Sequence, residues 1–378
     1  MTTESTEGAT IRSEVAGRRT ARMPGPGMLA RLVRRPELGA LSGAILIYIV
    51  FYALAGSSGM FTLEGIINIL QVSAEIGILA AAATLLMIAG EFDLSMGSMV
   101  GFAGVTIGLL ATVYHVPLAL AVALAVLACG TIGAANGWLT VKTKLPSFIV
   151  TLASMLILRG LTIAVTRYIN GYTQISKITA SDPDSFVVGL FSAHVGQPVF
   201  LWMAQHGWIE SKANGLPRIE GLPISILWWV GLTALATWIL LRTRFGNWIF
   251  AVGGDETAAR NVGVPVHRVK ITLFVLTALS AVVFACVQVF EIGSADTLRG
   301  TLKEFDAIIA VVIGGTLLTG GYGSAVGAFL GALIYGTVQI GILYTGVDSD
   351  LFKVFLGMMV LLAVFFNNYV RRRATLAR

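Results

Sequence analysis

The chain has few charged residues and only two cysteines, and its composition is not that of a soluble domain. Asp, Glu, Lys and Arg make up 12% of its 378 residues, and its mean hydropathy is +0.82, which is far too apolar for a soluble globular protein. Cys129 and Cys286 both lie inside apolar runs. This placement argues against a disulfide scaffold and predicts two small buried residues.

Motifs for nucleotides and metals are also missing. No G-x-x-x-x-G-K-[ST] loop occurs, so the chain has no Walker A site for ATP phosphates. Gly321, Gly323 and Gly327 come close to a dinucleotide fingerprint, but their spacing is wrong and no strand precedes them. No H-E-x-x-H and no paired cysteines occur either. We therefore expect no catalytic residue, no metal and no cofactor bound by this chain.

What the chain does have is long apolar runs, with 56% of its residues hydrophobic. A membrane-spanning helix needs about 20 apolar residues, and in lipid such runs must be helical to satisfy their backbone. We predict an all-α, polytopic membrane protein with about ten transmembrane or re-entrant helices; a count of about eight spans with two re-entrant segments stays open. The runs begin near Leu38, Gly65, Met96, Pro117, Ser147, Leu222, Ile271, Ser324 and Leu351, and a shorter one covers 304–318.

The positions of lysine and arginine predict the orientation. Residues 1–38 are expected to form a disordered basic cytoplasmic tail, residues 39–370 the transmembrane domain, and residues 371–378 a basic cytoplasmic tail. With both termini in the cytoplasm, most lysines and arginines fall on the cytoplasmic side, as the positive-inside rule requires. The net charge of +6 is spread over the loops, which argues against nucleic acid as a partner.

The longest external segment is predicted at residues 168–221. It is either a cap at the membrane surface or a substrate contact. Tryptophans in and after it fit an aromatic belt at the interface: Trp202, Trp208, Trp228 and Trp229.

A polar island at residues 247–267 separates two long apolar runs. Asp255 and Glu256 open a stretch of good helix formers, and Gly263 followed by Pro265 stops it. The predicted helix has about two turns, too few to cross a bilayer. Basic residues on both sides of the island place it in the cytoplasm.

Four stretches in matching order resemble the ABC-transporter permeases of ribose/xylose-type sugar importers. They are GEFDLSMGSMVGFAG at 90–104, the stretch 136–161, the E-x-A-A-x-x-x-G pattern that begins at Glu256, and the stretch 305–336. The resemblance implies a multi-pass subunit of the bacterial inner (plasma) membrane that forms a homodimer within membrane lipid. It also implies a cytoplasmic ABC ATPase subunit, which binds ATP and Mg, and an external sugar-binding protein. The residues it assigns to ATPase coupling are Asp255, Glu256, Ala258, Ala259, Arg260 and Gly263.

Charged and polar residues inside the apolar runs are candidates for the substrate pathway. Glu75 and Arg159 each cost about 2.5–3.5 kcal/mol at a helix centre, so they should face the bundle interior, a cavity or one another. They either line the pathway, form a structural ion pair, or extend their charged ends to the membrane surface. Asn136, like Asn68 and Gln71, either binds sugar hydroxyls or bridges helices.

The turn at Glu91, Asp93 and Ser95 is a second candidate for the pathway or its gate. Asp93 and Ser95 match an Asp-Leu-Ser turn of the resembling family, whereas Glu91 replaces a glycine often found there, so its role does not carry over. Asp93 and Ser95 are also expected to cap a helix that starts at Met96. Capping and a transport role are compatible.

Gly323, Gly327 and Gly331 recur every fourth residue, the small-xxx-small pattern of closely packed membrane helices. The pattern predicts packing within the subunit or between subunits.

Together these features favour the permease subunit of an ABC importer for a monosaccharide or related polyol. An ion-coupled secondary transporter is the main alternative, because it also has about ten spans and intramembrane charges; the energy source distinguishes the two. An exporter or lipid-handling permease, and a membrane enzyme, have less support. The sequence does not name the substrate.

Overall fold

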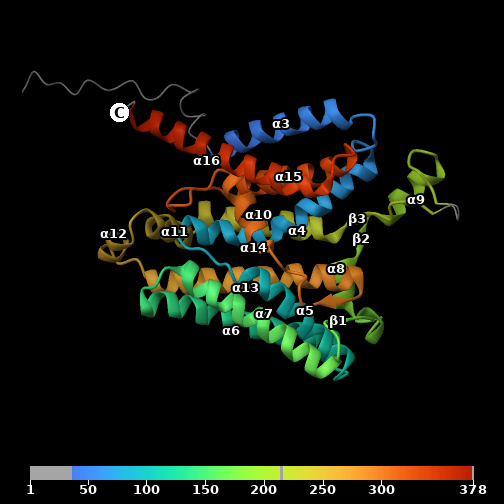
Figure 1. The fold of residues 1–378 in the computed structure, drawn as a ribbon, viewed down its shortest axis with the longest axis horizontal. Coiled ribbons are helices and arrows are strands. Elements are labelled where there is room, and N and C mark those ends of the chain that lie inside the picture. The colour runs from blue at the N-terminus through green and yellow to red at the C-terminus, as the bar shows by residue number, and fades with distance from the viewer. Residues whose placement is uncertain (1–35, 213–215, 377–378) are drawn as a thin grey trace, which may run out of the picture.

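The computed structural model describes residues 36–212 and 216–376, and its ribbon is a bundle of roughly aligned helices (Figure 1). In this part of the chain, seven helices are long and apolar enough to cross a membrane. They are α3 (Pro36–Ala55), α4 (Leu63–Ile88), α6 (Leu118–Thr143), α7 (Ser147–Asn170), α10 (Ile224–Arg242), α13 (Val266–Ile292) and α15 (Ala325–Tyr344).

Three further helices account for the remaining predicted runs: α5 (Met96–Thr112), α14 (Lys303–Ile313) and α16 (Phe352–Leu376). The prediction of an all-α polytopic membrane protein is therefore confirmed. Other short elements are α8 (Phe186–Ser192), α9 (Gln197–Gln205), α11 (Arg244–Gly254), α12 (Glu256–Asn261), and the 3-10 turns η1 (Thr179–Ser181) and η2 (Ser349–Leu351). Two small antiparallel pairs join β1 (Gln174–Ile175) to β4 (Ala295–Asp296) and β2 (His194–Val195) to β3 (Leu222–Pro223).

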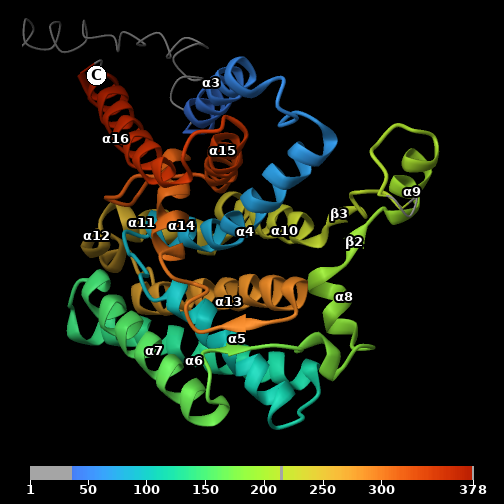
Figure 2. The same ribbon diagram turned by 45° about the vertical axis from the view of Figure 1, so that its right-hand side comes forward.

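The helices α4 and α13 form the centre of the bundle. α13 packs against α4, α5 and α6, while α15 packs against α4 and α3, so α6 and α7 lie on one side and α3 and α15 on the other (Figure 2). α4 and α13 are mostly buried, whereas only 28% of the residues in the apolar windows of α6, α7 and α10 are buried. Such exposed surface is suited to lipid.

Two spans are interrupted by non-helical backbone. α5 starts only after the non-helical residues 91–95, and α14 starts after the loop that contains β4. The two helix starts meet, because a side chain at Gly97 would clash with the carboxylate of Glu304 and the backbone of Gly300. With 11 residues, α14 is about 16 Å long, roughly half of the hydrocarbon core.

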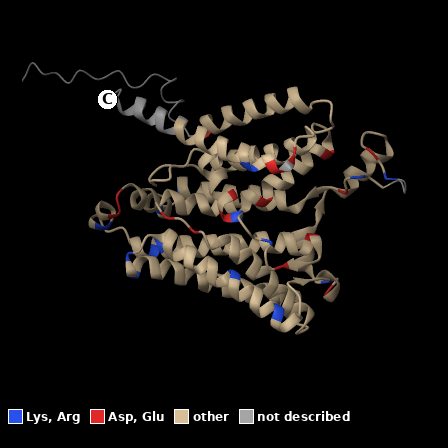
Figure 3. Ribbon diagram, in the orientation of Figure 1, with Lys and Arg blue, Asp and Glu red and all other residues tan. Residues whose placement is uncertain are grey.

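Both ends of the described chain lie on the side of α12. Figure 1 shows the start of α3, the end of α16 and α12 at one end of the bundle, and α9, β2 and β3 at the other. Charged residues are concentrated at these ends and in loops, with a few inside the bundle (Figure 3). The arrangement matches the prediction that the termini and the polar island share a side; that this side is cytoplasmic stays a prediction.

Several expectations meet other outcomes. The prediction that Trp229 lies at the membrane interface is wrong, because Trp229 is buried and stacks on Phe329 with ring centroids 3.9 Å apart. Most of the predicted tail at 1–38 lies outside the described residues. Residues 371–376 continue α16. The segment 168–221 contains β1, η1, α8, β2 and α9, and Trp202 and Trp208 on it are exposed.

The glycines predicted to pack helices lie against α14 and its end. A side chain at Gly331 would clash with the carbonyl oxygen of Ala310, and one at Gly327 with that of Gly314. At Gly323 a Cβ would lie 2.7 Å from the side chains of Ile88 and Thr316. These contacts are all within one subunit.

We expect Gly331→Ala to destabilise the fold by about 1–3 kcal/mol, because the atom it meets is backbone and cannot rotate away. Thermal unfolding of the purified protein in detergent would show a lower midpoint. Gly160→Ala is the matched control, since Gly160 is also in a spanning helix and has nothing within 4 Å of its Cβ position. Equal midpoints for the two variants would contradict the close contact.

Candidate functional site

The short helix α12 forms at the predicted place. The Asp255 side chain caps it by accepting a hydrogen bond from the Ala258 amide at 2.9 Å. Gly263 ends it with a φ of 88°, a left-handed conformation that favours glycine. Its amide donates to the Arg260 carbonyl. The capping residue and the stop were both visible in the sequence.

One face of α12 is exposed and the other is buried. Asp255, Ala258 and Arg260 are exposed, and Val262 just after the helix has 79% of its surface exposed. Ala259 is only 3% exposed and packs into an apolar cluster. Ala259 therefore anchors α12 to the bundle, and we call this apolar contact the seat of α12. The exposed face of α12 is the part that a partner can reach.

The seat of α12 is extended by α11, which was not predicted. α11 is capped by Thr243, whose hydroxyl accepts a hydrogen bond from the Gly246 amide at 3.1 Å. Its last turn meets the end of α4, where a side chain at Gly253 would clash with the Ile88 carbonyl. That carbonyl accepts a hydrogen bond from Gly321 at 2.8 Å. The α11–α12 unit thus touches both α4 and the loop before α15.

Lys270 on α13 joins α12 to the segment after α4. Its Nζ lies 2.7 Å from Glu256 Oε2 and 2.5 Å from Glu91 Oε1. Glu256 also pairs with Arg260 at 2.7 Å. Partial burial raises the pKa of Glu256, but its bonds to Lys270 and the charge of Arg260 outweigh burial and hold that pKa below its usual value. The carboxylate of Glu256 is therefore ionised at neutral pH.

Residues 91–95, the buried segment, run into the protein between the ends of α4 and α5. Non-helical backbone inside a membrane protein needs partners from the chain itself. The Phe92 amide donates to Ser147 Oγ at 3.0 Å, and the Leu94 amide donates to Thr151 Oγ1 at 3.1 Å. Both acceptors are in the first turns of α7, so the start of α7 holds this segment.

Asp93 binds across the bundle. Its Oδ1 accepts from the Ser95 amide and hydroxyl at 2.9 and 2.6 Å, and its Oδ2 accepts from Thr277 Oγ1 of α13 at 2.6 Å. Asn136 of α6 donates to Ser95 Oγ at 3.0 Å. Ser95 makes no side-chain cap bond to α5, so the expectation that these residues cap the helix is wrong: they tie the segment to α6 and α13.

Arg159 and Glu75 do not pair with one another. Arg159 Nη2 lies 3.8 Å from Oε1 of Glu304, which is fully buried where the starts of α5 and α14 meet. Two helix N-termini favour a negative charge there. In this structure Arg159 thus takes part in an ion pair inside the bundle.

Glu75 belongs to a polar row between α4 and α13. Gln288 Nε2 donates to Glu75 Oε2 at 3.0 Å, and Gln71 donates to Glu291. The row lies in the half of the bundle away from α12, because Glu291 is next to the last residue of α13. Gln288 Oε1 is buried without a partner in the described residues. Such a row can bind hydroxyl groups.

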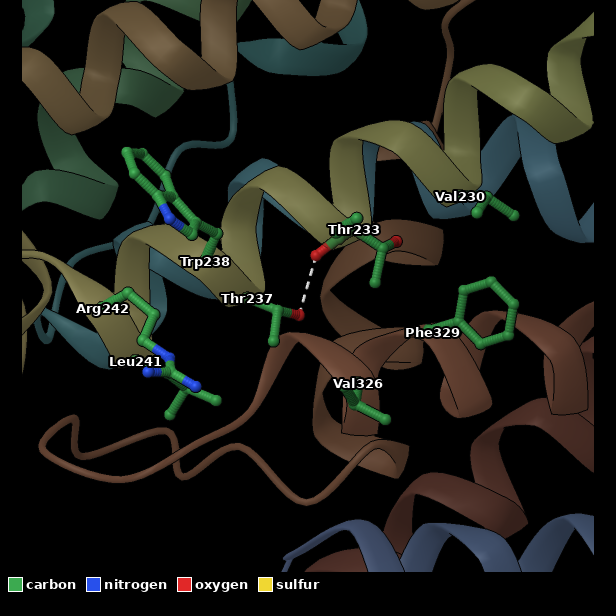
Figure 4. A pocket seen from close by; sticks show the side chains of 9 residues that line it. Val230, Thr233, Thr237, Trp238, Leu241, Arg242, Val326 and Phe329 are labelled. Carbon is green, nitrogen blue, oxygen red and sulfur yellow. Dashed lines mark hydrogen bonds between the residues drawn. The ribbon is translucent and has the colours of Figure 1, made fainter.

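An apolar groove lies between α10 and α15 (Figure 4). Its volume is about 520 Å³, and its wall includes Trp238, Val326 and Phe329. The Thr237 hydroxyl at this groove donates to the Thr233 carbonyl at 2.8 Å, so it is already engaged. The groove is better suited to an acyl chain or another helix than to a sugar.

The most important contacts at this site were not predicted. Lys270 counted only as a basic loop residue, and Thr277, Ser147 and Gln288 stood among apolar residues without a distinguishing pattern. Their polar side chains inside spans were the only available signal. For the described residues, no group of three or more His, Cys, Asp or Glu is arranged to hold a metal.

Comparisons with known proteins give a consistent result. Residues 65–364 match a family described as branched-chain amino acid transport system / permease component. The chain is 34% identical to the ribose import permease protein RbsC of Escherichia coli (strain K12), over 82% of this chain and 88% of that protein. It is 30% identical to the xylose transport system permease protein XylH of the same strain, over 89% and 93%. No solved structure shows a significant match.

We expect Thr277→Val to destabilise the protein by about 1–3 kcal/mol, because it removes a donor from the buried Asp93 carboxylate. The measurement is thermal unfolding in detergent. Thr337→Val is the matched control, because Thr337 is equally buried and, in the described part of the chain, its hydroxyl bonds to Leu333 of its own helix. A midpoint for Thr277→Val no lower than that of Thr337→Val would show that the Asp93 contact contributes nothing.

Proposed function

The chain belongs to the family of ABC-transporter permease components, and on this premise we propose that it is the membrane-spanning subunit of a sugar importer, driven through α12 by a separate ATPase. It is a multi-pass inner-membrane protein, a transport subunit and not itself an enzyme. The observation that carries the proposal is α12: a capped helix that is seated by Ala259 and presents Val262 to solvent.

An exposed valine beside a short polar helix suits a protein contact. The fully buried core of a protein–protein interface is more apolar than the rest of the protein surface. In the proposed complex, Asp255, Glu256, Ala258, Arg260 and Gly263 surround this contact, while Ala259 acts only through the seat. ATP and Mg bind the ATPase subunit, because this chain has no Walker A loop.

The proposed mechanism depends on the packing of α12 and α11 against the bundle. When the ATPases close on ATP they would press on α12, and α11 would transmit the displacement to the end of α4 and the loop before α15. Such a push biases a two-state equilibrium between inward-open and outward-open forms. A homodimer is the simplest assembly that gives two such levers around one pathway. An external binding protein would deliver substrate at the end that carries α9.

The polar row supports a polyhydroxylated substrate. Gln71, Glu75, Gln288 and Glu291 offer amide and carboxylate groups in the half of the bundle where substrate would enter. Sugar hydroxyls both donate and accept hydrogen bonds, so an uncharged sugar can bind to these amide and carboxylate groups. The ribose and xylose permeases among the relatives favour a monosaccharide.

We expect Val262→Asp to abolish association with the ATPase, because it places a charge at the proposed contact. The fold should stay intact, because the Val262 side chain is exposed. The measurement is the ATPase activity that co-purifies with the tagged chain from its native membrane. Val347→Asp is the control; Val347 is also exposed, in the loop after α15 at the opposite end. Full co-purification with Val262→Asp would contradict the role of α12.

Uptake experiments test the class of substrate and the energy source. In proteoliposomes that hold the co-purified complex and the binding protein, d-ribose and d-xylose should compete with the transported solute, and internal ATP should be required. l-Leucine should not compete. Uptake that follows an ion gradient without ATP would favour the secondary transporter, and competition by l-leucine alone would replace the sugar with an amino acid.

A further inference from the structure

We propose that Lys270 is the positioning residue that ties α12 to the buried segment, residues 91–95. The inference rests on the proposed function, in which α12 receives the force, and it adds the route from α12 to the segment inside the bundle. Lys270 is 9% exposed and is the one residue in the described chain that forms ion pairs with both Glu256 of α12 and Glu91.

The geometry makes the tie short and direct. Two carboxylates from distant parts of the sequence lie 2.5 and 2.7 Å from one ammonium group. Charge-assisted hydrogen bonds at such distances are the strong class. The Lys270 and Glu91 side chains are only 11% exposed, whereas Glu256 is 42% exposed. Screening by salt is therefore weaker for the Lys270–Glu91 pair than at the surface.

Glu91 is placed to pass a movement on. It follows Gly90, whose φ of 84° lets the chain turn sharply out of α4. It precedes Phe92 and Leu94, whose amides are held by Ser147 and Thr151. In the described residues, Lys270 is the ion-pair partner of Glu91. A shift of α12 that moves Lys270 therefore pulls on the start of the buried segment.

The apolar seat of α12 does not supply the same route. Ala259 belongs to an apolar cluster formed with residues of α4, α10, α11 and α13, and the glycine contacts of α11 reach Ile88, Gly90 and Gly321. Neither contact includes residues 91–95. Lys270 thus carries the connection from α12 to the segment that Asp93 joins to α13 and α6.

Hydrogen exchange of the full-length chain in nanodiscs tests the tie without any partner. Exchange at Phe92 and Leu94 reports the buried segment, and exchange at residues 258–262 reports α12. We expect Lys270→Met to raise exchange in both places by about tenfold. Lys270→Arg, which keeps the positive charge, should restore most of the protection.

The decisive result is the cross-effect. Glu91→Gln should raise exchange in α12, and Glu256→Gln should raise exchange at Phe92 and Leu94, although in the described structure each residue is linked to the responding segment by ion pairs only through Lys270. Coupling between two sites is reciprocal, so both effects should appear. When Lys270→Met is already present, adding Glu91→Gln or Glu256→Gln should cause no further increase in the hydrogen-exchange rate of either segment.

Lys303→Met is the matched control, because Lys303 is also partly buried and pairs with Asp306 of its own helix at 3.4 Å. It should leave both segments unchanged. Purely local effects of Glu91→Gln and Glu256→Gln would overturn the inference. That result would leave the proposed function intact, since ATPase association is tested separately by Val262→Asp.

Discussion

The structure depends on hydrogen bonding where no water is available. A bilayer tolerates non-helical backbone only if protein groups satisfy it. Amides of residues 91–95 meet this condition through the Leu86 carbonyl and the side chains of Ser147, Thr151 and Asp93. The same requirement explains why Asp93 has three short bonds and is tolerated in the interior. The non-helical break between α4 and α5 is therefore stabilised by specific hydrogen bonds, and it links α4, α6, α7 and α13 at one place.

Charged side chains within the bundle follow the same logic. Each is costly in a membrane unless it is paired, and the described structure pairs Arg159 with Glu304, Glu75 with Gln288, and Lys270 with two carboxylates. The pairs divide the bundle by position: the Lys270 pair lies beside α12, the Arg159 pair where two helix starts meet, and the Glu75 pair towards the other end. A transporter needs an element to receive force, a hinge region and a polar pathway, and the charges mark candidates for each.

Much of the fold could be predicted from the sequence because hydrophobic length and helix signals are local. The runs at Met96 and Ser147 begin where the helices begin, and Asp255 and Gly263 bound α12 as predicted. The contacts of the site could not be predicted, because pairing is not local. Lys270 and Glu91 are far apart in sequence, and the choice of Glu304 as the partner of Arg159 depends on how α7 meets α14. Trp229 shows the same limit, since only packing reveals that it is buried.

The most direct test of the account is the side of the membrane on which α12 lies. Asn261→Cys can be labelled in intact cells with a membrane-impermeant maleimide; the native Cys129 and Cys286 are fully buried and should not react. The account predicts labelling only after the membrane is permeabilised or in inside-out vesicles. Labelling in intact cells would place α12 outside, out of reach of any cytoplasmic ATPase, and would contradict the account.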